Sequence, residues 1–389
     1  MTTRLYYRDA ALLDFSARVL DLADDGRRVY LDASAFYPTS GGQPHDAGTL
    51  GGASVVDVVD EGDRVAHLLD APLAAAVGDT VAGAVDAARR LDHMQQHTGQ
   101  HLLSAVFADL LGADTASVHF GADSSTIELT VPALDRAQVL AVEARANALV
   151  AADLAVAVSF EDAATATGLR KPSDRAGELR IVAIDGVDRS ACGGTHVSST
   201  ARIGAVLLRR VERVRQNARI EFVCGLRAVR RARADYDALA EVAASFSAGV
   251  DQVPALVRTQ GEGARETQSR AERLEREVAA LRATSLVAAA EPDAQGVRWV
   301  VERTSGPVDA LRALALAVAE QPRAVFVALG AEPAAVLVAA SADGGVDAGA
   351  VLKRALAEVG GKGGGSPRLA QGRVPDAASL DRVRAVLVP

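Results

Sequence analysis

Two short motifs that lie far apart in the sequence place the strongest constraint on the fold. The first contains His97 and His101, and the second, Cys192-Gly-Gly-Thr-His196, contains a cysteine and a third histidine. If the first motif is helical, its four-residue step puts both imidazoles on one face. A cysteine and a histidine from a glycine turn could complete the coordination of one divalent metal, and this ligand set favours Zn²⁺. The fold must therefore bring the two motifs together.

The residues around the first motif limit its chemistry. Thr98 stands where the HExxH motif of zinc proteases carries its glutamate base, so protease chemistry is not predicted. His93 lies one helical step earlier, but eight residues span about 12 Å along a helix, which is too far for His93 and His101 to share an ion. We select His97 and His101 because they precede the apolar Leu102, and we expect His93 beside the site or at the surface.

Composition indicates a globular chain of two or three domains, because 389 residues with 49% hydrophobic and 24% charged side chains can bury substantial cores. The sequence shows no membrane-spanning run and no signal-peptide pattern at its start, so we predict a cytoplasmic protein without a membrane partner. Two cysteines exclude a disulfide framework. We expect Cys192 to be a ligand and Cys224, in an apolar run, to be a core residue.

Patterning along the chain predicts an α+β protein of four parts. Short β segments separated by Asp-Gly, Gly-Gly and Pro indicate a small β-barrel or a curled sheet, and a helix from Ala87 to Leu111 then opens a mixed region of strands and helices. Heptad-like spacing from Val253 to Leu281 predicts a helical hairpin or a coiled-coil linker. The predicted parts are a β-barrel (1–88), an α+β domain (89–228), a helical linker (229–290) and a Gly-rich α/β domain (291–389).

Charge gives a mixed indication about nucleic acid. The net charge of −8 argues against such a partner, because phosphate binding normally leaves a basic signature. Between Arg202 and Arg233, however, arginines far outnumber acidic residues. This arginine-rich run is either a solvated face or a stripe that contacts phosphates.

The motifs together carry a resemblance to a known family. His97-Thr-Gly-Gln-His101, Cys192-Gly-Gly-Thr-His196 and Ser40-Gly-Gly-Gln43 resemble the editing domain of alanyl-tRNA synthetase and its freestanding relatives, the AlaX proteins. The glycine run at 360–365 and the segment that follows it resemble the DHH-associated domain of the synthetase. The resemblance spans nearly the whole chain. Because the β region starts almost at Met1, without room for an aminoacylation core, it implies a long-form freestanding editor.

The resemblance implies an activity and a set of site residues. The activity is hydrolysis of the ester that joins a wrong amino acid, chiefly serine and secondarily glycine, to the 3′ end of alanine tRNA. The implied zinc ligands are His97, His101, Cys192 and His196. The candidate catalytic residues are His119 and Gln43, and the candidate substrate-binding residues are Thr39, Gly41, Gly42, Ser117, Arg170 and Lys171. Synthetases often carry glutamine where this chain has His119.

Other readings stay open at the level of sequence. Four protein ligands usually mean a structural zinc, so the chain could be a non-catalytic, zinc-stabilised RNA-binding module. A DHH-type phosphohydrolase would need clustered aspartates that are missing, and an amidohydrolase acting on a small molecule is a third alternative. The heptad-like seam suggests a homodimer, although helix packing within one chain would give the same pattern.

Overall fold

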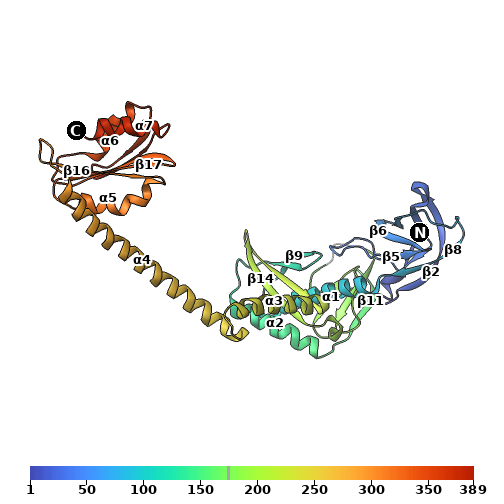
Figure 1. Ribbon diagram of the computed structural model, residues 1–389. Helices are drawn as coiled ribbons and strands as arrows, with labels where there is room; N and C mark the ends of the chain where they lie inside the picture. The colour runs from blue at the N-terminus through green and yellow to red at the C-terminus, as the bar shows by residue number, and fades with distance from the viewer. Residues whose placement is uncertain (173–175) are drawn as a thin grey trace. The chain divides into compact units, whose positions relative to one another are not determined.

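The computed structural model describes residues 1–172 and 176–389. These residues form two compact units, Met1–Glu241 and Val242–Pro389 (Figure 1). No helix in the described ranges combines the length and the apolar character needed to cross a membrane. Both motifs belong to the first unit, and the predicted division into four parts stays a prediction.

The N-terminal part of the first unit is a closed barrel in which the strands follow the order β2-β3-β7-β6-β5-β8. Its strands are β2 (Asp14–Ala23), β3 (Arg28–Leu31), β5 (Gly48–Leu50), β6 (Ala53–Glu61), β7 (Arg64–Leu69) and β8 (Thr80–Val85). The alternation of β2 is typical, because Phe15, Ala17 and Val19 are buried while the residues between them are exposed. Two further short strands, β1 (Thr3–Arg4) and β4 (Ala33–Ser34), form a separate parallel pair.

Helix α1 (Ala87–Leu111) has the bounds that its sequence predicts. The Asp86 side chain accepts hydrogen bonds from the first helical amides, and Gly112 ends the helix in the left-handed conformation. Every residue from His93 to Phe107 is buried, so the helix is enclosed on all sides instead of showing one apolar stripe. Gln96, for example, exchanges two hydrogen bonds with the backbone of Cys224, whereas the buried Nδ1 atom of His93 has no hydrogen-bond partner within the described ranges.

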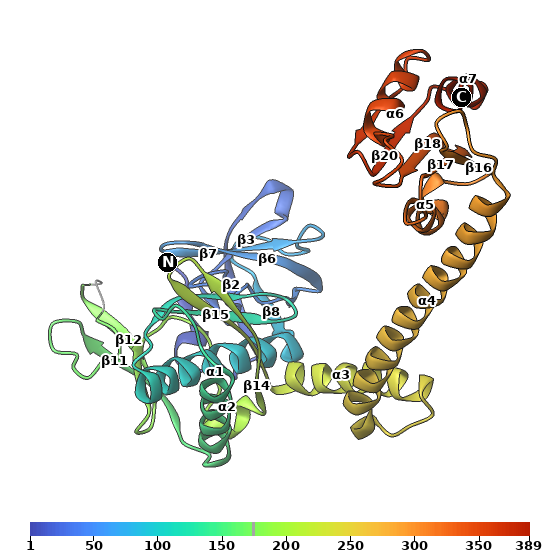
Figure 2. The same cartoon turned by 90° about the vertical axis from the view of Figure 1, so that its left-hand side faces the viewer.

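The region after α1 contains two sheets and a second helix. One sheet has the order β14-β15-β10-β9 and the other the order β11-β12-β13. The elements are β9 (Thr115–Phe120), β10 (Ser125–Leu129), α2 (Arg136–Ala151), β11 (Val156–Asp162), β12 (Glu178–Ile184), β13 (Asp188–Ala191), β14 (Val206–Val214) and β15 (Asn217–Cys224). The ribbons of α1, α2, β14 and β15 lie together in Figure 2. Side chains of α1, α2 and the first sheet share one hydrophobic core.

A buried ion pair joins the barrel to α1. Arg90 and Asp46 are both fully buried, and the Arg90 guanidinium also donates to the carbonyls of Ala10 and Ala35. Asp46 in turn accepts a hydrogen bond from the amide of Tyr37 at 2.7 Å. These contacts hold the glycine-rich loop of the barrel against the start of the helix that carries the first motif.

The arginine-rich run spans several elements. It is divided among β14, β15 and helix α3 (Gly225–Ser245). Arg209 is paired with Asp235, Arg219 with Glu128, and the buried Arg227 with Asp92. Cys224 is fully buried, which confirms its predicted core position.

The second unit contains a single continuous helix, α4 (Val253–Ala289), where the sequence left a hairpin and a coiled coil open. A sheet of order β16-β17-β18-β20-β19 follows. Alternate residues of β17 and β18 pack on opposite sides, against α5 on one face and against α6 and α7 on the other (Figure 1). The elements are β16 (Arg298–Thr304), α5 (Arg312–Ala319), β17 (Ala324–Ala331), β18 (Ala334–Ala340), α6 (Ala348–Ala357), β19 (Lys362–Gly365), β20 (Leu369–Arg373) and α7 (Ala378–Leu387).

Candidate metal centre and active site

The two motifs meet in the first unit. Helix α1 supplies His97 and His101, and the glycine turn after β13 supplies Cys192 and His196. One ligand atom from each of the four residues lies within 4.8 Å of every other. The Cys192 Sγ atom is 3.4 Å from His97 Nε2 and 3.3 Å from His196 Nε2. The cluster could hold a metal ion.

The spacing and the donor types fit zinc. Tetrahedral zinc with ordinary bond lengths separates a thiolate sulfur from an imidazole nitrogen by about 3.5 Å, which is close to both sulfur–nitrogen distances in the cluster. The three histidines are buried, so competing water has little access to the nitrogens.

Each histidine has its Nδ1 atom held by a separate polar group. The pairs are His97 with Gln43 Oε1 at 2.8 Å, His101 with Asp188 Oδ2 at 2.9 Å, and His196 with Thr98 Oγ1 at 3.1 Å. A proton on Nδ1 leaves Nε2 deprotonated and directed toward the cluster, which is the arrangement that a metal ligand needs. The three partners therefore fix the orientation of the imidazoles before any ion binds.

Gln43 is an orienting residue in this structure. Its Oε1 atom contacts His97 and also accepts from the amide of Thr195 at 3.1 Å, while its Nε2 donates to the Thr195 hydroxyl at 2.9 Å. The side chain is buried and bonded through both of its polar atoms. The catalytic role predicted for Gln43 stays a prediction, and in this structure both polar atoms of its amide have protein partners.

Asp188 links the cluster to a residue predicted to bind phosphate. Its second carboxylate oxygen accepts from Arg170 Nε at 2.7 Å, and Ser190 Oγ donates to the carboxylate at 2.9 Å. Arg170 is therefore engaged by a buried carboxylate, whereas Lys171 is exposed beside it. Phosphate binding by Arg170 and Lys171 stays a prediction.

The electrostatics of the cluster favour a thiolate. Burial alone would raise the pKa of Cys192, but the neighbouring His97 and His196 lower this pKa well below its usual value. Burial also opposes charge on His101, yet its hydrogen bonds to Asp188 and Cys192 raise its pKa to about 9. Burial lowers the pKa of His196 to about 3.

A cavity of about 660 Å³ opens beside the cluster. His97, Cys192, Gly193 and Gly194 line it on one side, and the barrel loop contributes Gly41 on the other. The predicted Gly41 therefore does reach the cavity. Gly41 has a φ of +55°, which favours glycine in this tight loop.

Glycine at 194 follows from a close approach. A Cβ atom there would lie 2.2 Å from His97 Cε1 and 3.1 Å from Gln43 Oε1. The amide of Gly194 points to Cys192 Sγ at 3.4 Å, and the Thr195 amide is taken by Gln43. The amide of Gly193 donates no hydrogen bond within the described part of the chain and stands at the cavity wall.

The strand β9 places the predicted catalytic histidine away from the cluster. Phe120 is buried and its ring centroid lies 5.0 Å from that of His97, so the alternate residues Ser117 and His119 belong to the opposite face. His119 is exposed there, and its predicted catalytic role stays a prediction. Ser117 donates to Glu128 at 3.0 Å.

The remaining predicted residues have mixed placements. Thr39 is exposed and accepts a hydrogen bond from the amide of His45 at 3.0 Å. Gly42 packs against the Phe120 ring, with a φ of +86°. Ser117 lines a second hollow with His101, Arg170 and Lys171.

Three orienting contacts were not predicted from sequence. Thr98 lies inside the first motif. Its hydroxyl directly follows the ligand His97, and this position could have indicated an orienting role. Asp188 precedes the second motif by four residues but carries no distinguishing pattern. Gln43 was identified, although with a different role.

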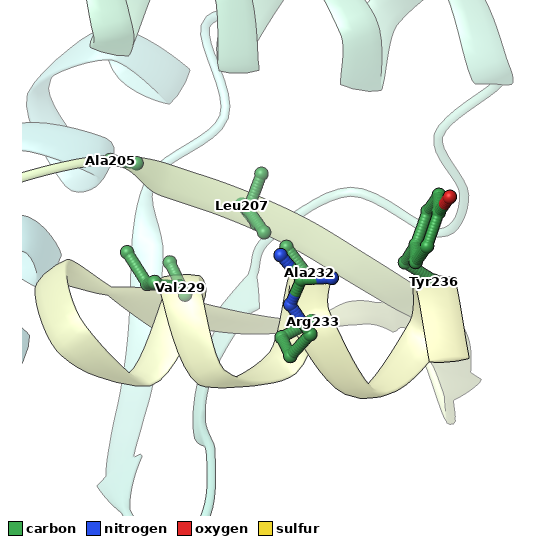
Figure 3. A pocket seen from close by; sticks show the side chains of 7 residues that line it. Ala205, Leu207, Val229, Ala232, Arg233 and Tyr236 are labelled. Carbon is green, nitrogen blue, oxygen red and sulfur yellow. The ribbon is translucent and has the colours of Figure 1, made fainter. Parts of the chain in front are cut away.

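A further hollow of about 580 Å³ lies between β14 and α3 (Figure 3). It is lined by Ala205, Leu207, Ala228, Val229, Ala232, Arg233 and Tyr236. None of these lining residues is a carboxylate, a cysteine or a histidine, so the hollow offers no metal-ligand set.

Two family models match segments of this chain, one in each unit. The family model described as the threonyl and alanyl tRNA synthetase second additional domain matches residues 179–221, which include Cys192 and His196. The DHHA1 domain model matches residues 296–388. Alanine–tRNA ligases from Methanospirillum hungatei and Halorubrum lacusprofundi are 32% and 36% identical, each over 98% of this chain. Over nearly its whole length the chain is therefore similar to alanine–tRNA ligases.

The chain spans less than half of the length of these synthetase relatives. It covers 42% of the Methanospirillum protein and 43% of the Halorubrum protein. The alanine–tRNA ligase from Pyrobaculum neutrophilum is 35% identical, over 96% of this chain and 42% of its own length. A solved C-Ala domain of alanyl-tRNA synthetase from Aquifex aeolicus is 22% identical, with 24% of this chain and 91% of that chain covered and a TM-score of 0.20.

Proposed function

We propose that the chain is an aminoacyl-tRNA deacylase that acts on mischarged alanine tRNA. The substrate is seryl-tRNA, with glycyl-tRNA as the second candidate, and the bond broken is the ester between the amino acid and the 3′ end. The observation that carries the proposal is the four-residue cluster at the wall of a cavity. Two of the four residues lie in the segment that matches the threonyl and alanyl tRNA synthetase second additional domain. Alanine tRNA is accordingly the proposed partner.

The proposed cofactor is Zn²⁺, held by His97, His101, Cys192 and His196. Sulfur–nitrogen distances of 3.3 and 3.4 Å and the three fixed imidazoles support this ligand set. A bound zinc ion would supply a Lewis acid that polarises a carbonyl or a water molecule beside it.

The protein contributes positioning and electrostatic stabilisation. In the hydrolysis, the hydroxyl of water adds to the ester carbonyl carbon, the carbon–oxygen bond to the RNA breaks, and the RNA oxygen takes the proton. The free amide of Gly193 is the candidate donor to the developing oxyanion, because the amides of Gly194 and Thr195 already have partners. Buried imidazoles held by fixed partners keep this geometry constant through the reaction.

A deacylation assay tests the proposal. Purified protein should hydrolyse seryl-tRNA and leave alanyl-tRNA intact, and a chelator should abolish the activity. Cys192→Ala should lose the activity together with the metal. If the metal-loaded protein leaves seryl- and glycyl-tRNA intact, the deacylase proposal is wrong. Unfolding on metal removal would then favour a non-catalytic, zinc-stabilised RNA-binding module.

A further inference from the structure

Phe160 is an exposed aromatic residue beside the candidate active site. It leaves 39% of its surface exposed on β11, where it pairs with Arg180 of β12. Directly paired residues of antiparallel strands have side chains on the same face. Both residues line the cavity that also contains His97 and Cys192.

Arg180 connects Phe160 to the second motif. Its Nη1 atom donates to the carbonyls of Cys192 and Gly194, the latter at 2.9 Å, and its Nε donates to the carbonyl of Tyr7. The residue is 8% exposed and forms no ion pair with a carboxylate in the described ranges. The guanidinium also lies over the Tyr7 ring, 5.5 Å from its centroid. Without a carboxylate partner it keeps a positive charge at the cavity wall, where an anionic group can approach it.

The other aromatic residues of the cavity are less accessible. Tyr6 and Tyr37 are buried and pack edge to face with ring centroids 5.3 Å apart, and Tyr7 is half-buried. Among the lining residues, Phe160 therefore presents the most exposed ring. The Arg8 guanidinium lies 6.0 Å from the centroid of this ring, so a second positive charge stands beside it.

We propose that Phe160 stacks against the base of the unpaired 3′-terminal nucleotide of the RNA substrate, with Arg180 facing its sugar–phosphate backbone. This inference rests on the proposed function, because the nucleotide that bears the ester must lie next to the cluster for the ester to be hydrolysed there. Proteins hold unpaired nucleotides by stacking them on aromatic rings beside positive charge. A volume of about 660 Å³ is within the usual range for ligand sites, so it can admit a nucleotide with its amino acid.

Binding to an RNA hairpin tests the proposal without requiring catalysis. The probe is a fluorescent hairpin of the alanine-tRNA acceptor stem with an unpaired 3′-terminal adenosine, and its twin has an abasic terminal residue. Fluorescence anisotropy with the full zinc-loaded chain gives the Kd. Phe160→Ala should weaken binding of the intact hairpin about tenfold, whereas Phe160→Tyr should retain it.

Matched controls separate stacking from general damage. Val158 lies on the same strand and is 37% exposed, but it lines a different hollow, so Val158→Ala should bind like the wild type. The abasic twin should bind the wild type and Phe160→Ala equally. Equal binding of the intact hairpin by the wild type and Phe160→Ala, or equal weakening of both hairpins, would overturn the proposal, as would a wild type that does not prefer the intact hairpin.

The deacylation assay keeps the two proposals distinguishable. A wild type that distinguishes the hairpins through Phe160 but leaves seryl-tRNA intact would retain the stacking site and reject the deacylase. Hydrolysis of seryl-tRNA with unchanged KM in Phe160→Ala would retain the deacylase and reject the stacking site.

Discussion

At the scale of single residues, Thr98 shows how one hydroxyl can serve the cluster without touching an ion. Its Oγ1 atom lies 3.1 Å from His196 Nδ1 and accepts from the amide of Val197 at 3.1 Å. The hydroxyl thus orients a ligand of the second motif from the helix that carries the first. Thr98 therefore has a structural role at the position where zinc proteases carry glutamate.

Replacement of Thr98 should weaken metal binding. Thr98→Val removes the acceptor for His196 and leaves the buried amide of Val197 without a partner, so zinc affinity should fall about 10- to 100-fold. Thr98→Ser keeps the hydroxyl and should bind zinc nearly as well as the wild type. Competition with a chromophoric chelator measures both. Equal affinities of the valine and serine variants would show that the hydroxyl does not orient His196.

His67 should make folding stability depend on pH. It is fully buried, with Nδ1 at 3.1 Å from the carbonyl of Val29 and Nε2 at 2.7 Å from Ser34 Oγ, and burial lowers its pKa to about 4. The unfolded chain takes up this proton near pH 6.5, so the stabilisation is present above pH 6.5 and is lost as the pH falls toward 4. Between pH 7 and 5 the free energy of unfolding should drop by about 2 kcal/mol from this residue.

Urea unfolding of the wild type and His67→Gln at both pH values measures the contribution of His67. The metal cluster is present in both proteins, so the difference between their pH dependences isolates His67. The variant should be less stable at pH 7 and should lose less stability on acidification. Parallel pH profiles for the two proteins would contradict the assignment.

The sequence predicted a residue's role where the residue type and spacing decide that role. It did not predict the role where the direction of the side chain decides it. Histidines and a cysteine at these spacings indicated the ligand set, and the four atoms do gather. His119 was predicted to act in the site, but the alternation of β9 directs it to the face opposite Phe120. A single-residue shift in strand pairing reverses such an assignment, and the sequence of one strand does not contain that register.

At the scale of elements, the glycine turn after β13 supports the cluster through its close packing. A Cβ atom at Gly194 would overlap the His97 ring, whereas one at Gly193 would meet its nearest atom, Tyr7 Oη, at 3.6 Å. The two adjacent glycines therefore differ sharply in their tolerance of a side chain.

This difference predicts contrasting alanine variants. Gly194→Ala should displace the His97 ring and lower the bound zinc well below one ion per chain, because the ring is held between Gln43 and the turn. Gly193→Ala keeps its amide and should retain a full complement of zinc. Metal content by atomic spectroscopy, with circular dichroism as the check on folding, compares them. Full zinc in a folded Gly194→Ala protein would refute the packing argument.

Elements with strong local signals were predicted well. The bounds of α1 follow from Asp86 and Gly112, which act on their own neighbours through hydrogen bonds and backbone conformation. The hairpin of β14 and β15 was not predicted, because its arginines suggested a charged surface stripe. Ion pairs with acidic residues far away in the sequence neutralise several of those arginines. Such partners cannot be predicted from the residues next to each arginine.

At the scale of the whole molecule, the division into units predicts that metal binding is independent of the C-terminal part. All four cluster residues and their orienting partners lie within Met1–Glu241. A fragment of residues 1–249, which keeps α3, should fold and bind one zinc ion with the affinity of the full chain. Metal titration and thermal unfolding check this, and a fragment that folds only with the remaining residues added would contradict it.

Self-association stays a prediction. The heptad-like seam lies on α4, where Val278 and Leu281 are mostly exposed. Such a seam is suited to packing against a second copy. Analytical ultracentrifugation of the full chain measures the oligomeric state directly.

The sequence by itself determined the four residues that gather in the cluster and the bounds of α1. These depend on ligand types and on short-range periodicity, which are written in neighbouring residues. Only the tertiary structure decided which groups orient the imidazoles, which face His119 occupies, and that Phe160 and Arg180 share a cavity with the cluster. Those properties arise from pairing between segments far apart in the chain, where strand register and helix rotation set the direction of every side chain.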